Sequence, residues 1–169
     1  MRPLVSIIMG STSDWTVMEK AAKTLNDFEI PFEINALSAH RTPDEVSAFA
    51  KKAHKRGVKA IIAGAGMAAH LPGVIAAMTP VPVIGVPIKA SLEGWDAMLA
   101  ILQMPPGIPV AAVAVNGAQN AAILAVQILA VGNKKIFKQY EAFKNSLKEK
   151  IVQANEDFSK IEFEFKVNQ

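Results

Sequence analysis

The chain has 169 residues, 51% of them hydrophobic, and a formal net charge of +3, which predicts one domain with a substantial core. It contains no cysteine, which excludes disulfides, thiolate nucleophiles and cysteine-ligated metals. We expect no secretory signal and no membrane span, because the apolar runs are too short for either. The sequence therefore predicts a cytoplasmic protein.

Short apolar runs alternate with amphipathic segments along the chain. The first run, LVSIIMG, is apolar and ends at glycine, as buried parallel strands do. The segment after it places Met18, Ala21 and Leu25 on one helical face. In chain order we expect strand 4–10, helix 14–29, strand 32–37, a helix from about 43, strand 59–65, a short helix 71–78, strand 81–87, helix 94–103, strand 109–115 and helix 117–131.

Five strands that are each followed by a helix predict parallel β-α-β units with right-handed crossovers. Five strands are too few for an eight-fold barrel. We therefore expect a flavodoxin-like, doubly wound α/β fold of three layers, α/β/α, with strand order 2-1-3-4-5. Residues 1–132 are expected to form this single catalytic domain.

The C-terminal part, residues 133–169, has a different pattern. Residues 133–155 predict an extra helix with one apolar stripe, formed by Ile136, Tyr140, Phe143, Leu147 and Ile151. This helix would pack on its own domain or on a neighbouring subunit, and the sequence leaves both open. The tail 161–167 alternates like an exposed or edge strand.

Charge is unevenly distributed. Between Gly57 and Gly132 the chain has only four charged residues, too few to solvate the surface of a monomer. This predicts a homo-oligomer that covers part of the region. With three arginines in total and most lysines mixed with acids, nothing indicates a nucleic-acid partner.

Three loops that follow the first three strands are rich in glycine, hydroxyl groups and histidine. They are GSTSD (10–14), SAHRTP (38–43) and GAGMAAHLPG (64–73). Ligands of doubly wound sheets bind beyond the carboxyl ends of the strands, where the strand order reverses, and these three loops meet there. We therefore expect them to form one site.

Each candidate residue also has a simpler interpretation. The serines of GSTSD suit a phosphate at a helix N-terminus but equally suit plain helix capping. Asp14 suits ribose hydroxyls, because its charge would repel a phosphate. Arg41 suits phosphate oxygens, and His40 can exchange a proton near neutral pH. His70 would contact substrate or cap a short helix, whereas His54 is expected to be solvated.

The sequence lacks the motifs of several common sites. The histidines have no metal-ligand spacing, and there is no Walker loop, GxGxxG fingerprint or GxSxG elbow. We therefore expect no metal and no cofactor, but a phosphate pocket with a general acid-base.

Six blocks of the chain resemble the PurE family, over roughly residues 4–131 and in the family's order. They are GSTSDW, SAHRTP, GAGMAAHLPGVIAA, PVIGVP, QMPPGIPVA and NAAILAVQIL. The forms SAHRTP and AAHLPG look like class I of the family, the N5-carboxyaminoimidazole ribonucleotide mutases. The resemblance implies a homo-octamer of de novo purine (IMP) biosynthesis without metal or cofactor. Its ribonucleotide substrate would release CO2 and be recarboxylated at ring carbon C4.

The resemblance also implies the roles of particular residues. His40 and His70 would be catalytic. Substrate contacts would come from Ser11, Ser13, Asp14, Ser38, Arg41, Gly64, Ala65, Gly66 and Leu71. Two residues depart from the family pattern: Met67 stands where glycine is common, which predicts an ordinary backbone conformation there, and Pro106 stands where arginine is common.

Two other functions stay open. A class II enzyme of the family would carboxylate aminoimidazole ribonucleotide directly with CO2. A non-catalytic phosphosugar-binding module is the second alternative, because the fold does not determine the function.

Overall fold

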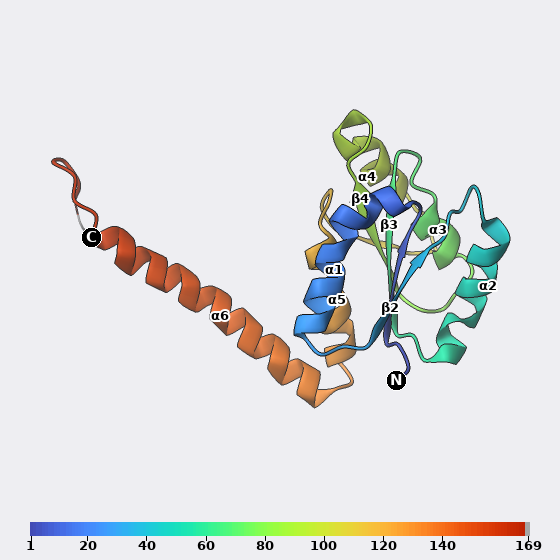
Figure 1. Cartoon of the computed structure of the whole chain (residues 1–169), viewed down its shortest axis with the longest axis horizontal. Coiled ribbons are helices and arrows are strands. Elements are labelled where there is room, and N and C mark those ends of the chain that lie inside the picture. Colours follow the sequence, from blue (N-terminus) through green and yellow to red (C-terminus); the bar gives the residue numbers. More distant parts are fainter. Residues whose placement is uncertain (168–169) are drawn as a thin grey trace.

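Five parallel strands form a single sheet in the computed structural model, which describes residues 1–167 (Figure 1). The strands are β1 Val5–Met9, β2 Phe32–Ala36, β3 Ala60–Gly66, β4 Val83–Ile88 and β5 Ala111–Ala112. Their order is β2-β1-β3-β4-β5, which confirms the predicted flavodoxin-like order. The edge strand β2 is hydrogen-bonded only to β1, in a register that sets Ser6 beside Glu33.

Helices cover both faces of the sheet. They are α1 Trp15–Asp27, α2 Pro43–Ala53, α3 Leu71–Ala76, α4 Trp95–Leu102, α5 Ala118–Ala130 and α6 Lys134–Ser159. Helices α1 and α5 pack on the face that receives Val5 and Ile7, and α2, α3 and α4 pack on the face that receives Ile8. All five residues of β1 are buried, as a strand covered on both sides must be.

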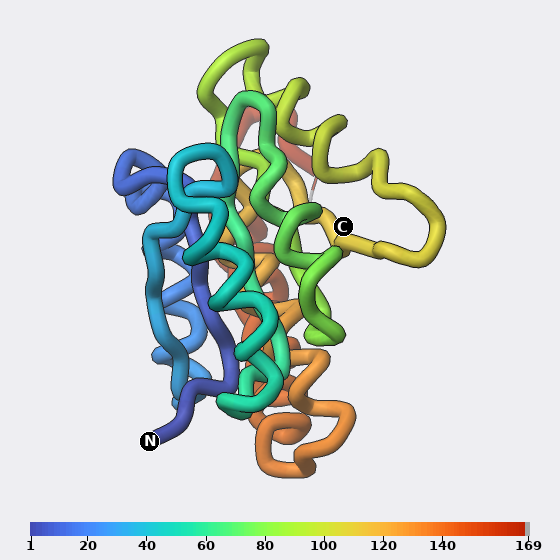
Figure 2. Tube along the Cα trace, turned by 90° about the vertical axis from the view of Figure 1, so that its right-hand side faces the viewer, coloured from blue at the N-terminus to red at the C-terminus, as the bar shows by residue number. Residues whose placement is uncertain are grey.

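The loops that follow β1, β2 and β3 lie at the same end of the molecule, as Figure 2 shows. Parallel strands all point the same way, so their carboxyl ends share one edge of the sheet. That edge brings together segments that are far apart in the sequence, and it carries the candidate site.

Two expected strands were wrong in extent or existence. The strand expected at 109–115 is only Ala111–Ala112. Pro109 lacks an N–H, and beyond Ala112 the chain keeps isolated bonds to β4, from the Val113 N–H to the Gly85 carbonyl and from the Asn116 N–H to the Pro87 carbonyl. The tail 161–167 forms no strand at all, because no neighbouring strand is available to pair with it. Instead Lys166 donates hydrogen bonds from Nζ to the carbonyl oxygens of Phe158 and Ser159 at the end of α6.

Helix α6 begins against the body and then projects away from it (Figure 1). Ile136 is its one buried residue, and the Phe143 ring packs edge-on against Phe28 with 5.4 Å between the ring centroids. Beyond Ser146 the helix exposes Leu147 and Ile151. It runs to Ser159, four residues past the expected end at 155. In residues 1–167 no helix is long and apolar enough to cross a membrane.

Candidate functional site

A cavity of about 440 Å³ lies at the carboxyl ends of the strands and is lined by all three predicted loops. Its lining includes most of the predicted site residues: Ser11, Ser13, Asp14, Ser38, His40, Arg41, Ala65, Gly66, His70 and Leu71. A parallel sheet covered on both faces leaves this edge as the place where polar groups can face solvent. The predicted convergence of the loops is therefore confirmed.

The first loop both caps a helix and faces the cavity. The Ser11 side chain accepts a hydrogen bond from the Ser13 N–H at 3.3 Å, and the Asp14 carboxylate accepts one from the Ser11 N–H at 3.2 Å. This is a capping box on the short 3-10 helix Thr12–Asp14 that leads into α1. The capping and ligand interpretations are thus compatible, because the capping residues themselves line the cavity.

The Asp14 carboxyl is partly desolvated. Burial raises its pKa above the ordinary value of an aspartate, and the opposing hydrogen bond from the Ser11 N–H and the nearby Arg41 charge do not cancel this effect. Folding has already removed part of the water around this carboxylate. Replacing the remaining water with a ligand hydroxyl therefore costs less desolvation free energy. Asp14 is therefore suited to accept hydrogen bonds from a bound molecule.

The second loop is a closed turn between Ser38 and Thr42. The Ser38 N–H donates to the Thr42 Oγ1 at 2.9 Å, and the Thr42 N–H donates to the Ser38 carbonyl at 2.8 Å. Pro43 then starts α2, as its fixed φ favours at a first helical position. We call this segment the Ser38–Thr42 turn; the two hydrogen bonds join its ends to each other.

Arg41 connects this turn to the first loop. Its Nη2 donates to the Gly10 carbonyl at 2.9 Å, and its Nε lies 3.4 Å from the Ser38 Oγ. The guanidinium group is exposed and lines the cavity, so further N–H groups remain for an anion.

Two histidines from different loops form a hydrogen-bonded pair. The His40 Nε2 lies 2.7 Å from the His70 Nδ1, and the rings meet edge-on at 81°. One nitrogen donates and the other accepts, so the pair holds a proton at the cavity. His70 occupies the N-cap position of α3, but its side chain makes no capping hydrogen bond and pairs with His40 instead. His54 is exposed at the far end of α2, as expected.

Comparison of the sequence with known proteins identifies the family of the chain. The family described as AIR carboxylase matches residues 4–150. The N5-carboxyaminoimidazole ribonucleotide mutase of Thermotoga maritima is 48% identical over 168 residues, which cover 99% of this chain and 98% of that protein. The chain belongs to the PurE, or AIR carboxylase, family.

A longer relative and a solved structure also match the chain. The phosphoribosylaminoimidazole carboxylase of Candida glabrata is 52% identical over 164 residues, yet the chain spans only 29% of its length. A crystal structure of Treponema denticola PurE has a TM-score of 0.84 at 33% identity and covers 92% of this chain and 98% of that one. The family resemblance carried by the six sequence blocks is thereby confirmed.

Met67 departs from the family pattern in a way that the sequence predicted wrongly. Its φ is +54°, so it keeps the left-handed conformation that glycine would adopt without strain. The reason is local: the Ala69 N–H donates to the Met67 carbonyl at 2.8 Å, and the His70 N–H donates to the Ala68 carbonyl at 2.7 Å. These tight turns aim His70 at His40. The Met67 side chain is 61% exposed and lines the cavity.

Some lining residues match the expectations less closely. Gly64 is not among the lining residues; it lies inside β3, where an added Cβ would come within 2.6 Å of the Met18 sulfur. Its expected substrate contact stays a prediction. Ala90, which sequence reasoning missed, enters the lining from the loop that follows β4. The rule that ligands meet carboxyl ends, applied to the fourth strand as well, would have found it.

Proposed function

We propose that the protein is an N5-carboxyaminoimidazole ribonucleotide mutase, an isomerase of purine biosynthesis. The observation that carries the proposal is the His40–His70 pair, held at 2.7 Å on the wall of a cavity that also contains Asp14 and Arg41. The near-complete overlap with the Thermotoga maritima mutase supports the same activity.

The nucleotide end of the substrate would bind between the first two loops. Arg41 offers a guanidinium fork and Ser38 a hydroxyl to the phosphate, with Ser11 and Ser13 beside them. Asp14 lies on the same wall and would accept hydrogen bonds from the ribose hydroxyls. This orientation sets the aminoimidazole ring toward Ala65, Gly66 and the two histidines.

The chemistry needs one proton that is given and then recovered. His40, as the acid, protonates the exocyclic nitrogen while its bond to the carboxyl carbon breaks, which yields CO2 and aminoimidazole ribonucleotide. Ring carbon C4 then attacks CO2 and forms the new carbon–carbon bond. His40, now the base, removes the C4 proton and restores the aromatic ring. His70 holds the His40 imidazole in place through their hydrogen bond.

CO2 must stay beside C4 between the two steps. Small apolar side chains favour this because they offer no competing hydrogen bonds, and Ala65 and Ala68 line the cavity. Ala69, also expected in such a cage, is buried behind the lining. The substrate is bound without a metal or cofactor in this mechanism, and subunits of a homo-octamer would cover the charge-poor surface.

Direct carboxylation of aminoimidazole ribonucleotide is the second candidate, because the Candida glabrata relative is named a carboxylase. The purified protein should be given N5-carboxyaminoimidazole ribonucleotide, or aminoimidazole ribonucleotide with low bicarbonate, and the 4-carboxy product followed by absorbance. The mutase proposal expects turnover of the first substrate. Product only from the second mixture would favour the carboxylase, and binding without product from either would favour a binding module.

A further inference from the structure

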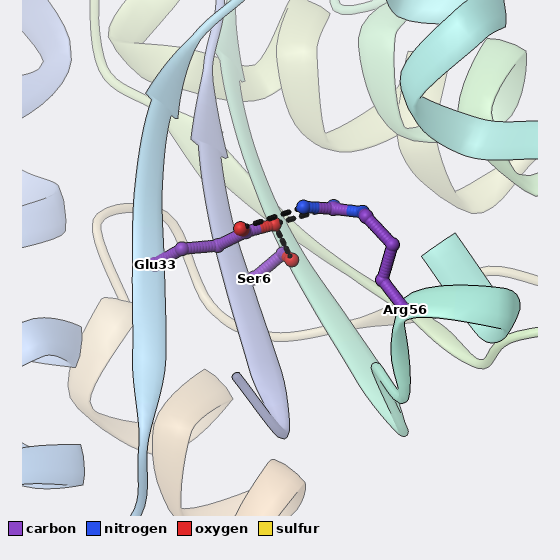
Figure 3. Close-up of polar contacts among 3 residues, drawn as sticks. All are labelled: Ser6, Glu33 and Arg56. Atoms are coloured by element: carbon purple, nitrogen blue, oxygen red, sulfur yellow. Dashed lines mark hydrogen bonds and ion pairs between the residues drawn. The ribbon is translucent and has the colours of Figure 1, made fainter. Parts of the chain in front are cut away.

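A polar cluster at the opposite end of the sheet from the cavity joins three elements: Ser6 on β1, Glu33 on β2, and Arg56 just after α2 (Figure 3). The Arg56 Nη1 and Nη2 donate to the two Glu33 carboxylate oxygens at 2.8 and 2.6 Å. The Ser6 hydroxyl, which is fully buried, donates to the Glu33 Oε1 at 2.6 Å. This is a two-pronged, charge-assisted contact with fixed geometry.

The orientation of Arg56 is itself supported. Its guanidinium carbon lies 5.1 Å from the centroid of the ring of Phe49, a residue of α2. The Ser6 hydroxyl and the Arg56 fork together hold the pKa of Glu33 below its ordinary value despite the opposing effect of burial, which is the largest single influence. Arg56 and Glu33, which we call the clamp, therefore stay paired at neutral pH.

The clamp joins the two ends of a unit that consists of β2, the Ser38–Thr42 turn and α2. From Glu33 to Ser38 the strand advances about 16 Å. Helix α2, with 11 residues, returns about the same distance to Arg56. One end of this unit is the clamp, and the other end carries His40 and Arg41. A shift of α2 along the sheet would move the turn by a similar amount.

Apolar packing alone does little to prevent such a shift of α2. Helix α2 faces the sheet with Val46, Ala50 and Ala53, and contacts between small apolar side chains have no preferred direction. In the apolar core α2 lies against Ile8 of β1 and Ile61 of β3, and the ion pair links its far end to the edge strand β2, which is bonded only to β1. A bidentate ion pair is directional, so it determines the register of helix against strand.

We propose that Arg56 and Glu33 are positioning residues that set the place of His40 against His70 from the far end of α2. The functional part of this proposal rests on the proposed mutase activity. The geometric part does not, because the His40–His70 hydrogen bond exists in the free protein.

The test compares Arg56→Met with Lys135→Met, which removes the exposed Lys135–Glu29 ion pair elsewhere in the chain. Arg56→Met should lower kcat/KM by about 10- to 100-fold at a temperature where it stays folded, as small misplacements of catalytic groups do. The ¹⁵N ring resonances of His40 and His70 should shift in the free protein. Lys135→Met should change neither quantity. Arg56→Lys keeps the charge but loses the two-pronged guanidinium, and it replaces Arg56→Met if that variant does not fold. It should shift the same resonances and lower kcat/KM by a smaller factor.

A double variant separates positioning from unpaired charge. Glu33→Gln with Arg56→Met leaves neither charge of the pair without its partner, yet the clamp is still absent, so kcat/KM should stay low. Recovery to the wild-type value would overturn the proposal. Unchanged histidine resonances in the folded single variants would also overturn the proposal, whatever the thermal stability of these variants. If no variant or wild type turns over the substrate while the resonances still shift, the mutase activity fails and the clamp stands.

Discussion

The α/β body and helix α6, which we call the arm, differ in how far they bury their apolar residues. All five residues of β1 are buried, whereas among the 26 residues of α6 only Ile136 is. The arm exposes Leu147, Ile151 and Phe158 in this chain. The difference indicates that the body alone supplies the packed frame that holds the cavity, and that the arm contributes no residue to the cavity lining.

The first prediction measures this contrast directly. Ile7→Ala, in the body, should lower the free energy of unfolding by about 2–5 kcal/mol, because it leaves a cavity among side chains that cannot collapse. Ile151→Ala, in the arm, should change it by less than about 0.5 kcal/mol, because that side chain is 66% exposed. Chemical denaturation of both variants checks the pair. A large loss from Ile151→Ala would mean that another chain covers the arm.

Ion pairs in the two regions should differ in their response to acid. The pKa of Glu33 is lowered in the folded protein, relative to its ordinary value of 4.5. The stability it contributes is therefore present above pH 4.5 and is lost as the pH falls through the lower folded pKa. Glu33→Gln should flatten the acid limb of stability against pH. Asp157→Asn, which removes the exposed Asp157–Lys160 pair of the arm, should leave that limb unchanged.

Backbone strain is the third and smallest difference between the body and the arm. Five non-glycine residues with positive φ lie in the body, Met67 among them, and none lies in the described part of α6. Met67→Gly and Met67→Ala both remove the side chain, but only glycine tolerates φ +54° freely. We expect Met67→Gly to be the more stable of the two by about 1 kcal/mol. Equal melting temperatures would contradict a left-handed conformation at this residue.

The sequence predicted those features that follow from apolar runs and loop position. Four of the strands, their order and the meeting of three loops follow from buried parallel strands and the switch-point rule. The fifth strand was predicted, but its length was overestimated, because an apolar run does not reveal how many of its residues continue a regular ladder with the neighbouring strand. The tail 161–167 has the alternation of a strand, but alternation cannot supply a partner to pair with.

The distances within the site could not be predicted in the same way. His40 and His70 are 30 residues apart, and their 2.7 Å contact joins the loop before α2 to the tight turns that follow Met67. Residue identity suggested chemistry for each histidine separately. Only the folded loops show that the two rings are hydrogen-bonded to each other.

His40→Asn tests the central claim most directly, with His54→Asn as a matched control on an exposed histidine. We predict that His40→Asn loses at least about 10²–10⁴-fold in conversion of N5-carboxyaminoimidazole ribonucleotide, because its amide cannot exchange the proton. Substrate binding measured by calorimetry should stay within about tenfold, since a hydrogen-bonding group of similar shape remains. Turnover equal to that of the wild type and of His54→Asn would contradict the role of His40 as the acid-base.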